Sequence, residues 1–408
     1  MSSFPKKLAA FSRTLLLIPE FPYRWLRRRL SPRRNILFNV VLENHFDLFA
    51  PVYHRLRKDP RLQICFTNSQ KPRSAEPDFC RQHGLNPSCF LPQRRILLRR
   101  WDLCIEADYA FPLIARPACS VQTFHGNADK VTRSGRNFIL HRDLKHYDAL
   151  FCMSPDHVET LHQAGLLKHK KAAFCIGYPK LDALVDGSVH RDEVLKSYGA
   201  DPSRRSVLYA PSWDPQLSLE QIGTELINLL SGRRWAFLVK PHPKSFHFKP
   251  NDSDQKAPSG KDWKTFLDQL HRDRRLIHLT DQNTSRYLTA ADVLITDHGS
   301  TLFEYMILDR PILYYDTPQA NAQISFKNTL KKIRAAAYSF QTPDQALQLL
   351  KKNHIPDKTY MAQARKELFA QRFYQVGTAT DRAVAAIYKL LKLPLPDKDH
   401  NLPDANKI

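Results

Sequence analysis

The chain has 408 residues, a length that predicts two domains of ordinary size. Hydrophobic residues make up 42% of it and charged residues 25%, a globular balance that argues against a disordered or collagen-like chain. Its 62 Lys and Arg exceed its 40 Asp and Glu, and the net charge of +22 predicts attraction to polyanions such as nucleic acid, acidic lipid headgroups or phosphorylated substrates.

The cysteines indicate a reducing compartment. There are seven, without any CxxC pair, and several lie inside apolar runs such as 64–66 and 151–153. This pattern is typical of buried thiols in a cytosolic protein and not of a disulfide framework or a zinc site. No apolar stretch is long enough to cross a membrane, since a spanning helix needs about 20 residues.

Residues 1–34 differ from the rest of the chain. Nine Lys and Arg residues alternate there with aromatic and leucine side chains. Such a segment can lie on an anionic membrane, and it can equally be a basic, partly ordered tail. On the first reading the protein is cytoplasmic and peripheral on the inner face of the cell membrane.

From residue 35 the chain alternates short apolar runs with stretches of helical periodicity. Runs of four to six residues, rich in β-branched and aromatic side chains, are typical of strands buried on both faces. They are residues 36–41, 62–67, 103–107, 120–124, 149–153, 173–176, 206–210, 236–239, 276–279, 293–296 and 311–315. Helical periodicity over 217–230, 266–270 and 358–391 completes an alternation that predicts an α/β fold with parallel sheets.

Turn residues near 185–203 divide this pattern into two halves of five or six strands each. The economical model is two doubly wound domains. The expected units are a basic segment 1–34, a domain 35–185, a domain 186–392 and a disordered tail 393–408.

In doubly wound sheets, ligands bind beyond the carboxyl ends of the strands, so the residues that follow each strand are the candidate site. We call these strand ends junctions. At the first one, an imidazole, a glycine, an amide and a lysine follow residue 124: His125, Gly126, Asn127 and Lys130. The imidazole can accept a proton near neutral pH, and the lysine can hold a phosphate. A polar loop with a capping histidine is the alternative.

Two further junctions follow strands of the second half. Ser212 and Trp213 come after residues 206–210, where they can form a wall of a cleft or a turn with a half-buried indole. Lys240 and His242 follow residues 236–239, and prolines on both sides of His242 fix the backbone around the imidazole. That rigid frame favours a functional histidine.

The strongest junction follows residues 293–296. A buried strand ends there, and small residues open a helix whose free N–H groups and hydroxyls can bind an anion: Asp297, His298, Gly299, Ser300 and Thr301. A capping box from Thr301 to Glu304 would explain those two residues without a ligand, although it would not explain Gly299. No Asp/Glu cluster has metal-ligand spacing, and no Walker or GxGxxG motif occurs, so neither a metal nor a cofactor is expected.

Five of these elements together resemble the CDP-glycerol glycerophosphotransferase family, the teichoic-acid primases and polymerases. The matches lie in the family's order over roughly residues 120–316. They are His125-Gly126 with Lys130, Gly177-Tyr178-Pro179-Lys180-Leu181-Asp182, Ala210-Pro211-Ser212-Trp213, Lys240-Pro241-His242-Pro243, and Asp297-His298-Gly299-Ser300 with Glu304. Each is short, and their specificity comes from the ordered set.

The resemblance implies a GT-B fold, two Rossmann-like domains facing a cleft. It implies metal-independent transfer of glycerol phosphate from CDP-glycerol to a hydroxyl of a lipid-linked or polysaccharide acceptor, releasing CMP. By similarity His125 and His242 are the essential histidines, the Ser300 element binds the donor pyrophosphate, and Glu304 contacts donor hydroxyls. Either histidine can be the general base, and the other would then serve the leaving group.

The chain departs from the family pattern in the donor-binding region. The family has Tyr-Ser where this chain has His298-Gly299, Arg at the position of Lys180, and Asp at that of Glu304. Ribitol phosphate and sugar nucleotides therefore remain open as donors, and a GT-B glycosyltransferase of surface glycans is the alternative function. A nucleic-acid-binding protein is disfavoured because no DNA- or RNA-binding signature accompanies the charge.

Overall fold

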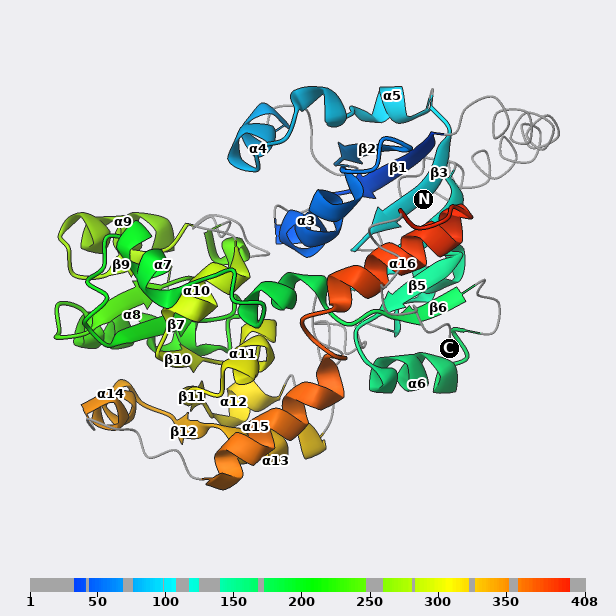
Figure 1. The fold of residues 1–408 in the computed structure, drawn as a ribbon. Coiled ribbons are helices and arrows are strands. Elements are labelled where there is room, and N and C mark those ends of the chain that lie inside the picture. The colour runs from blue at the N-terminus through cyan, green and yellow to red at the C-terminus, as the bar shows by residue number, and fades with distance from the viewer. Residues whose placement is uncertain are drawn as a thin grey trace, which may run out of the picture.

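The computed structural model folds into two lobes, each built around one parallel sheet (Figure 1). The residues that the structure describes are 33–41, 44–68, 76–97, 99–107, 117–124, 140–167, 172–246, 260–280, 283–322, 327–351 and 359–396. Nearly all of the basic segment 1–34 lies outside them.

The N-terminal sheet has the order β2-β1-β3-β4-β5-β6, and all neighbouring strands are parallel. Its strands are β1 Arg34–Asn39, β2 Leu62–Thr67, β3 Trp101–Glu106, β4 Pro117–Thr123, β5 Ala149–Cys152 and β6 Ala172–Cys175. The chain runs outward from β1 to β2 and then returns to build β3 on the other side of β1. Its topological switch point therefore lies between β1 and β3.

The C-terminal sheet has the order β12-β11-β10-β7-β8-β9 and is also parallel. Its strands are β7 Ser206–Ala210, β8 Ala236–Val239, β9 Ile277–His278, β10 Val293–Thr296, β11 Ile312–Tyr315 and β12 Tyr338–Phe340. Here the chain reverses direction between β7 and β10. Val207 and Tyr209 pack into one apolar cluster and Leu208 and Ala210 into another, so both faces of the sheet are covered.

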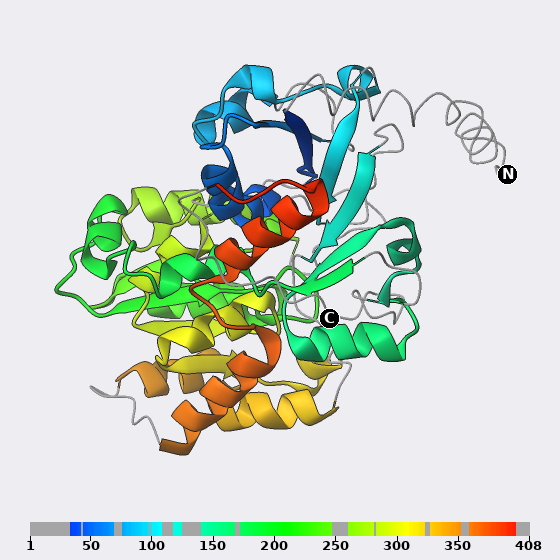
Figure 2. The ribbon, with the colours of Figure 1, turned by 45° about the vertical axis from the view of Figure 1, so that its right-hand side comes forward.

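Helices connect the strands and cover both sheets (Figure 2). The α-helices are α3 Asn44–Leu56, α4 Glu76–Gln82, α5 Gln93–Leu97, α6 Pro155–Gln163, α7 Arg191–Ser197, α8 Ser218–Leu230, α9 Trp263–Arg272, α10 Thr284–Ala290, α11 Ser300–Tyr305, α12 Pro318–Asn321, α13 Lys327–Ala336, α14 Pro343–Lys351, α15 Thr359–Arg372 and α16 Ala379–Leu391. The 3₁₀ helices are Pro87–Cys89, Arg142–His146, Pro179–Leu184, Pro243–Phe246 and Met306–Leu308.

The sequence predicts this α/β architecture well. All eleven expected strands are present, with ends shifted by up to three residues. β12 is not predicted by the sequence pattern, because its three residues form an edge strand with only Phe340 buried. The expected helical stretch 358–391 is interrupted at 373–378, where Gln375 and Gly377 adopt positive φ of 38° and 100°.

That interruption lets the chain return to the first lobe. After α15, helix α16 crosses back and packs against α3 and β3 of the N-terminal lobe (Figure 1). The sequence pattern places 379–391 in the second domain, because helical periodicity does not reveal which sheet a helix covers. Of the tail 393–408, residues 393–396 are described, and Arg61 donates a hydrogen bond to the Pro394 carbonyl at 3.0 Å.

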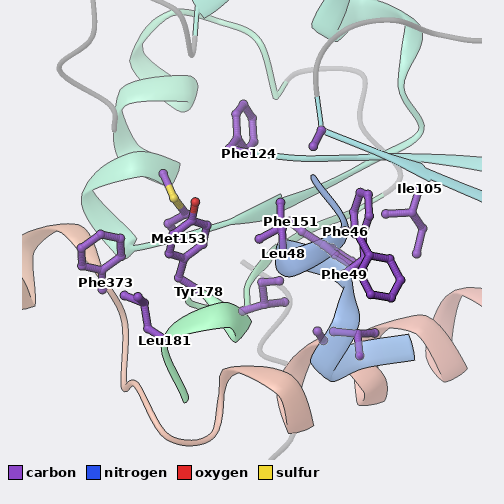
Figure 3. Close-up of a cluster of buried hydrophobic side chains, with 14 of the residues drawn as sticks. Phe46, Leu48, Phe49, Ile105, Phe124, Phe151, Met153, Tyr178, Leu181 and Phe373 are labelled. Carbon is purple, nitrogen blue, oxygen red and sulfur yellow. The ribbon is translucent and has the colours of Figure 1, made fainter. Parts of the chain in front are cut away.

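A continuous apolar core joins the N-terminal sheet to α3, α16 and the segment that leads to the second lobe (Figure 3). Phe46 and Phe49 of α3 and Phe151 of β5 belong to it. Tyr178, at the start of the connection, stacks on Phe373 with ring centroids 5.4 Å apart. The two lobes are therefore tied together by buried side chains at the point where the chain crosses between them.

The seven cysteines all lie in the described residues, and none forms a disulfide. Burial raises the pKa of the Cys65 and Cys175 thiols to about 11, so both stay protonated at neutral pH. No helix in the described part of the chain is both long and apolar enough to cross a membrane.

Candidate functional site

Three of the sequence-predicted junctions meet at one edge of the C-terminal sheet. Thr296 of β10 is paired with Ala210 of β7, and Tyr209 is paired with Val239 of β8. Because these strands are parallel neighbours, the loops that follow them lie side by side. We call the loops 211–217, 240–246 and 297–301 the β7–β10 edge. It contains the switch point of this sheet, where doubly wound proteins bind their ligands.

The buried side chain of Asp297 holds two segments next to this edge together. Its buried carboxylate accepts hydrogen bonds from the Ser212 N–H at 2.9 Å, from the Ser218 N–H at 3.1 Å and from the Ser218 hydroxyl at 2.6 Å. Burial raises the pKa of Asp297 to about 6, although the hydrogen bonds from Ser218 and Ser212 oppose that rise. The carboxylate therefore holds the loop after β7 and the first residue of α8 in place.

His242 lies half-buried at the end of β8 in the proline frame. Its Nδ1 accepts a hydrogen bond from the Lys244 N–H at 3.2 Å, and its carbonyl accepts one from the Ser245 N–H at 2.8 Å. Because Nδ1 is an acceptor, the proton of the neutral ring resides on Nε2. This geometry makes His242 a hydrogen-bond donor through Nε2.

Trp213 lies beside this histidine. The two ring centroids are 6.5 Å apart, and the Lys244 ammonium lies 4.9 Å from the indole centroid in a cation–π contact. Trp213 is half-buried, as is Ser212 before it. The loops after β7 and β8 thus bring an indole, an imidazole and an ammonium together.

The start of α11 completes the edge. Gly299 is its N-cap residue, with φ −151° and ψ 173°, and no side chain caps the helix. The capping box expected as the alternative is therefore absent, because Thr301 lies inside the helix and Glu304 pairs elsewhere. A methyl group built on Gly299 would lie 3.8 Å from the Ser212 Cβ, an ordinary contact. Neither backbone conformation nor packing requires glycine here.

Glu304 and Lys180 form an ion pair inside the protein. The Lys180 Nζ lies 2.7 Å from the Glu304 Oε1, with side-chain exposures of 14% and 1%. Burial would lower the pKa of Lys180, but the Glu304 carboxylate and the neighbouring tyrosines hold it above its ordinary value. The expected contact of Glu304 with donor hydroxyls stays a prediction.

The remaining predicted residues differ in how exposed their side chains are. Lys240 and His298 are buried at 7% and 9%, and the His298 ring packs edge-on against Phe303 with centroids 6.1 Å apart. Ser300 and Thr301 are half-buried. His125, Gly126, Asn127 and Lys130 lie outside the described residues, so their expected roles stay predictions.

One buried network at the N-terminal sheet was not anticipated. Glu106 ends β3, and its carboxylate accepts a hydrogen bond from the Asn39 amide at 3.0 Å and a short one from the Tyr147 hydroxyl. Glu106 is 1% exposed and Asn39 is fully buried. We call this group the β1–β3 edge. The available signal was a glutamate inside an apolar run, which was read only as part of a strand.

Among the described residues, no group of three His, Cys, Asp or Glu side chains is placed to hold a metal ion. The polar groups of the β7–β10 edge include N–H donors, hydroxyls, one donor imidazole and the Lys244 ammonium, beside the carboxylates of Asp214 and the buried Asp297. Such groups suit the oxygens of a phosphate or diphosphate.

Comparison with known families agrees with this geometry. Residues 116–389 match the model of the CDP-glycerol:poly(glycerophosphate) glycerophosphotransferase family, which is more than half of the chain. The chain belongs to this family. The match includes all five elements on which the sequence resemblance rests.

A curated relative points the same way. The teichoic acid poly(glycerol phosphate) polymerase of Bacillus spizizenii is 27% identical over 227 residues, which cover 48% of this chain and 50% of the relative. The chain thus spans about half the length of the curated relative it matches.

Solved structures establish the GT-B fold. The wall teichoic acid polymerase TagF in a variant soaked with CDPG superimposes with a TM-score of 0.63 at 17% identity, over 89% of each chain. A UDP-N-acetylglucosamine 2-epimerase from Listeria monocytogenes gives 0.54 at 15% identity, over 92% of this chain and 100% of that one. The expected pair of Rossmann-like domains is therefore confirmed.

Proposed function

We propose that this protein transfers glycerol phosphate, or a related alditol phosphate, from a CDP-activated donor to a hydroxyl of a lipid-linked or surface-polysaccharide acceptor. Family membership supports the reaction class. The observation that carries the proposal is the β7–β10 edge, where Gly299 lies beside Ser212 and the His242 ring lies 6.5 Å from the Trp213 ring, at the switch point of a GT-B sheet. That edge is where a nucleotide diphosphate would bind.

The chemical step is a displacement at the β-phosphorus of the donor. The acceptor oxygen forms a new bond to this phosphorus while the bond to the bridging oxygen breaks, and CMP leaves with that oxygen. The acceptor hydroxyl loses one proton, and the leaving phosphate gains negative charge. A base on the acceptor side and donors on the leaving-group side are therefore required.

The tautomer of His242 favours the second of these roles. With Nδ1 occupied by the Lys244 N–H, the Nε2–H can donate a hydrogen bond to a phosphoryl oxygen of the donor and then of the departing CMP. The general base is then His125, by resemblance to the family, since this residue lies outside the described part of the chain. Ser212, Ser300 and Thr301 supply further donors around the diphosphate.

The proposal of a membrane-bound acceptor is supported by the charge of the chain. The basic segment 1–34 and the net charge of +22 favour a protein that works at an anionic membrane surface, where lipid-linked acceptors reside. Sedimentation with anionic vesicles is the test, with binding expected to weaken as salt rises. A chain lacking residues 1–34 that sediments unchanged would exclude that segment as the anchor.

The reaction itself is tested by nucleotide release. Purified protein is incubated with CDP-glycerol, CDP-ribitol or UDP-sugars, together with a synthetic lipid acceptor that ends in glycerol phosphate. We expect CMP from a CDP-alditol only when the acceptor is present. Release of UDP alone would instead support a glycosyltransferase.

A further inference from the structure

The segment Gly177-Tyr178-Pro179-Lys180-Leu181-Asp182, here called the junction segment, links the lobes and is fixed on both sides. Gly177 has a φ of +84°, and a Cβ at this position would lie 2.4 Å from the Tyr374 carbonyl oxygen. Only glycine permits both the conformation and this close approach. The segment therefore runs in direct contact with the chain that returns to α16.

Asp182 fixes the other end of the segment to the N-terminal lobe. Its carboxylate accepts hydrogen bonds from the N–H groups of Gly377 at 2.7 Å, Ala379 at 3.2 Å and Thr380 at 2.7 Å. The residue before α16, Thr378, provides no side-chain cap. Asp182 thus supplies from a distance the cap that α16 lacks locally.

Lys180 connects the same segment to the C-terminal lobe. Its carbonyl accepts a hydrogen bond from the Ser285 hydroxyl of α10 at 2.8 Å, and its ammonium pairs with Glu304 of α11 at 2.7 Å. The ammonium also lies 4.9 Å from the Tyr178 ring centroid. Glu304 is one helical turn after Ser300, so a displacement of this pair displaces the start of α11 and Gly299 with it.

The two residues are matched in length as well as in charge. The Lys180 Nζ and the Glu304 Oε1 are 2.7 Å apart. Arginine at 180 would reach further than lysine, and aspartate at 304 would be one methylene shorter than glutamate. The two replacements together would therefore preserve the span between the junction segment and α11.

We propose that Lys180 and Glu304 act as a positioning pair that sets where α11, and with it the Gly299–Ser300 end of the β7–β10 edge, lies relative to the N-terminal lobe. The pair does not contact the donor, because Glu304 is 1% exposed. Its effect on the reaction passes through the donor-binding loop, and it therefore rests on the proposed function. A buried ion pair is better suited to fixing a geometry than to adding stability.

The test compares two isosteric neutralisations five residues apart, one within a short helical stretch and one at its C-cap. Glu304→Gln removes the partner of Lys180. Asp309→Asn is the matched control, because Asp309 ends the same stretch and pairs with the buried Arg365 at 2.6 Å, away from the junction segment. Asn also tolerates the left-handed backbone at 309, where φ is 49°.

Both variants should lower the melting temperature, but only one should weaken donor binding. We expect Glu304→Gln to raise the calorimetric Kd for CDP-glycerol, and the donor KM with it, by about tenfold or more. Asp309→Asn should leave the Kd within about twofold. Equal Kd values in both variants would overturn the proposal.

A length swap separates positioning from direct contact. Lys180→Arg and Glu304→Asp each alter the span, and the double variant restores it, so the double variant should recover a Kd within about threefold of wild type. If Glu304→Asp weakens binding and the swap does not rescue it, Glu304 contacts the donor itself and the proposal fails. These conservative variants also cover the case in which Glu304→Gln does not fold.

Hydrogen exchange measured without donor tests the positioning pair independently of the proposed function. Glu304→Gln should speed exchange in both 177–184 and 300–305, the swap should reverse it, and Asp309→Asn should leave 177–184 unchanged. A wild-type protein that ignores CDP-glycerol would refute the function and leave this exchange result standing. Unchanged exchange in 177–184 for Glu304→Gln would refute the pair.

Discussion

At the β7–β10 edge the buried Asp297 accepts three hydrogen bonds, two of them from backbone N–H groups, whereas at the β1–β3 edge Glu106 accepts from the side chains of Asn39 and Tyr147. The first arrangement shapes loops and leaves Ser212 and His242 half-exposed. The second ties strand ends together inside the protein. Both sheets therefore have a buried carboxylate at the switch point, but one carboxylate holds loops and the other holds side chains.

The largest expected effect concerns His242, the proposed hydrogen-bond donor of the β7–β10 edge. His242→Ala should lower CMP release by about 10²–10⁴-fold while the circular dichroism spectrum and melting temperature stay close to wild type. His242→Gln places an amide donor near the position of Nε2–H, so partial activity in this variant would assign hydrogen bonding to the leaving group.

If His242→Gln is as inactive as the Ala variant, a hydrogen bond to the leaving group does not account for the role of His242. His242→Asn serves as the control, because its carbonyl can still accept from the Lys244 N–H and preserve the loop. Wild-type turnover in the Ala variant would remove His242 from the site altogether.

The next effect is the pH dependence that Asp297 gives to stability. Its folded pKa of about 6 lies above the ordinary 3.8 of an unfolded chain, so its contribution is fully present below pH 4 and is lost as pH rises through 6. The stability of wild type relative to Asp297→Asn should therefore fall by about 2 kcal/mol between pH 4 and pH 7. Chemical denaturation at several pH values measures it, and a flat difference would contradict a buried carboxylate.

The next prediction concerns Glu106→Gln at the β1–β3 edge. Removing the charge leaves the hydrogen bond to Asn39 or to Tyr147 mismatched, and we expect a loss of about 1–3 kcal/mol in the free energy of unfolding. The donor KM should not change, because Glu106 is 1% exposed and lies in the N-terminal sheet, not at the β7–β10 edge. A donor KM that rises while stability holds would erase the distinction between the two edges.

The smallest effect concerns Gly299. Serine caps a helix slightly better than glycine, and the space beside Ser212 accepts a Cβ. Gly299→Ser should therefore raise the free energy of unfolding by a few tenths of a kcal/mol. Urea unfolding measures it, and a destabilisation above about 1 kcal/mol would mean that Gly299 is not the N-cap.

The sequence predicted those features that depend on local pattern. Continuous apolar runs located the strands, and the rule that ligands bind beyond strand ends selected the loops that meet at the β7–β10 edge. It could not separate Asp297 from His242, because a strand-end residue that faces inward has the same local sequence context as one that faces a ligand.

Partnerships between distant residues were also out of reach. Asp182 caps a helix that begins at residue 379, and Lys180 pairs with Glu304 across the lobes. The motif positions were recognised through the resemblance, but their physical roles depend on tertiary contacts. The direction in which α16 packs belongs to the same class.

The central claim is that a nucleotide diphosphate binds at the β7–β10 edge. Hydrogen exchange measured with and without CDP-glycerol tests it most directly. We expect slower exchange with CDP-glycerol bound in 211–217, 240–246 and 297–303, and no change in 36–41 or 101–107. Protection confined to the N-terminal sheet, with the three loops unaffected at saturating CDP-glycerol, would contradict it.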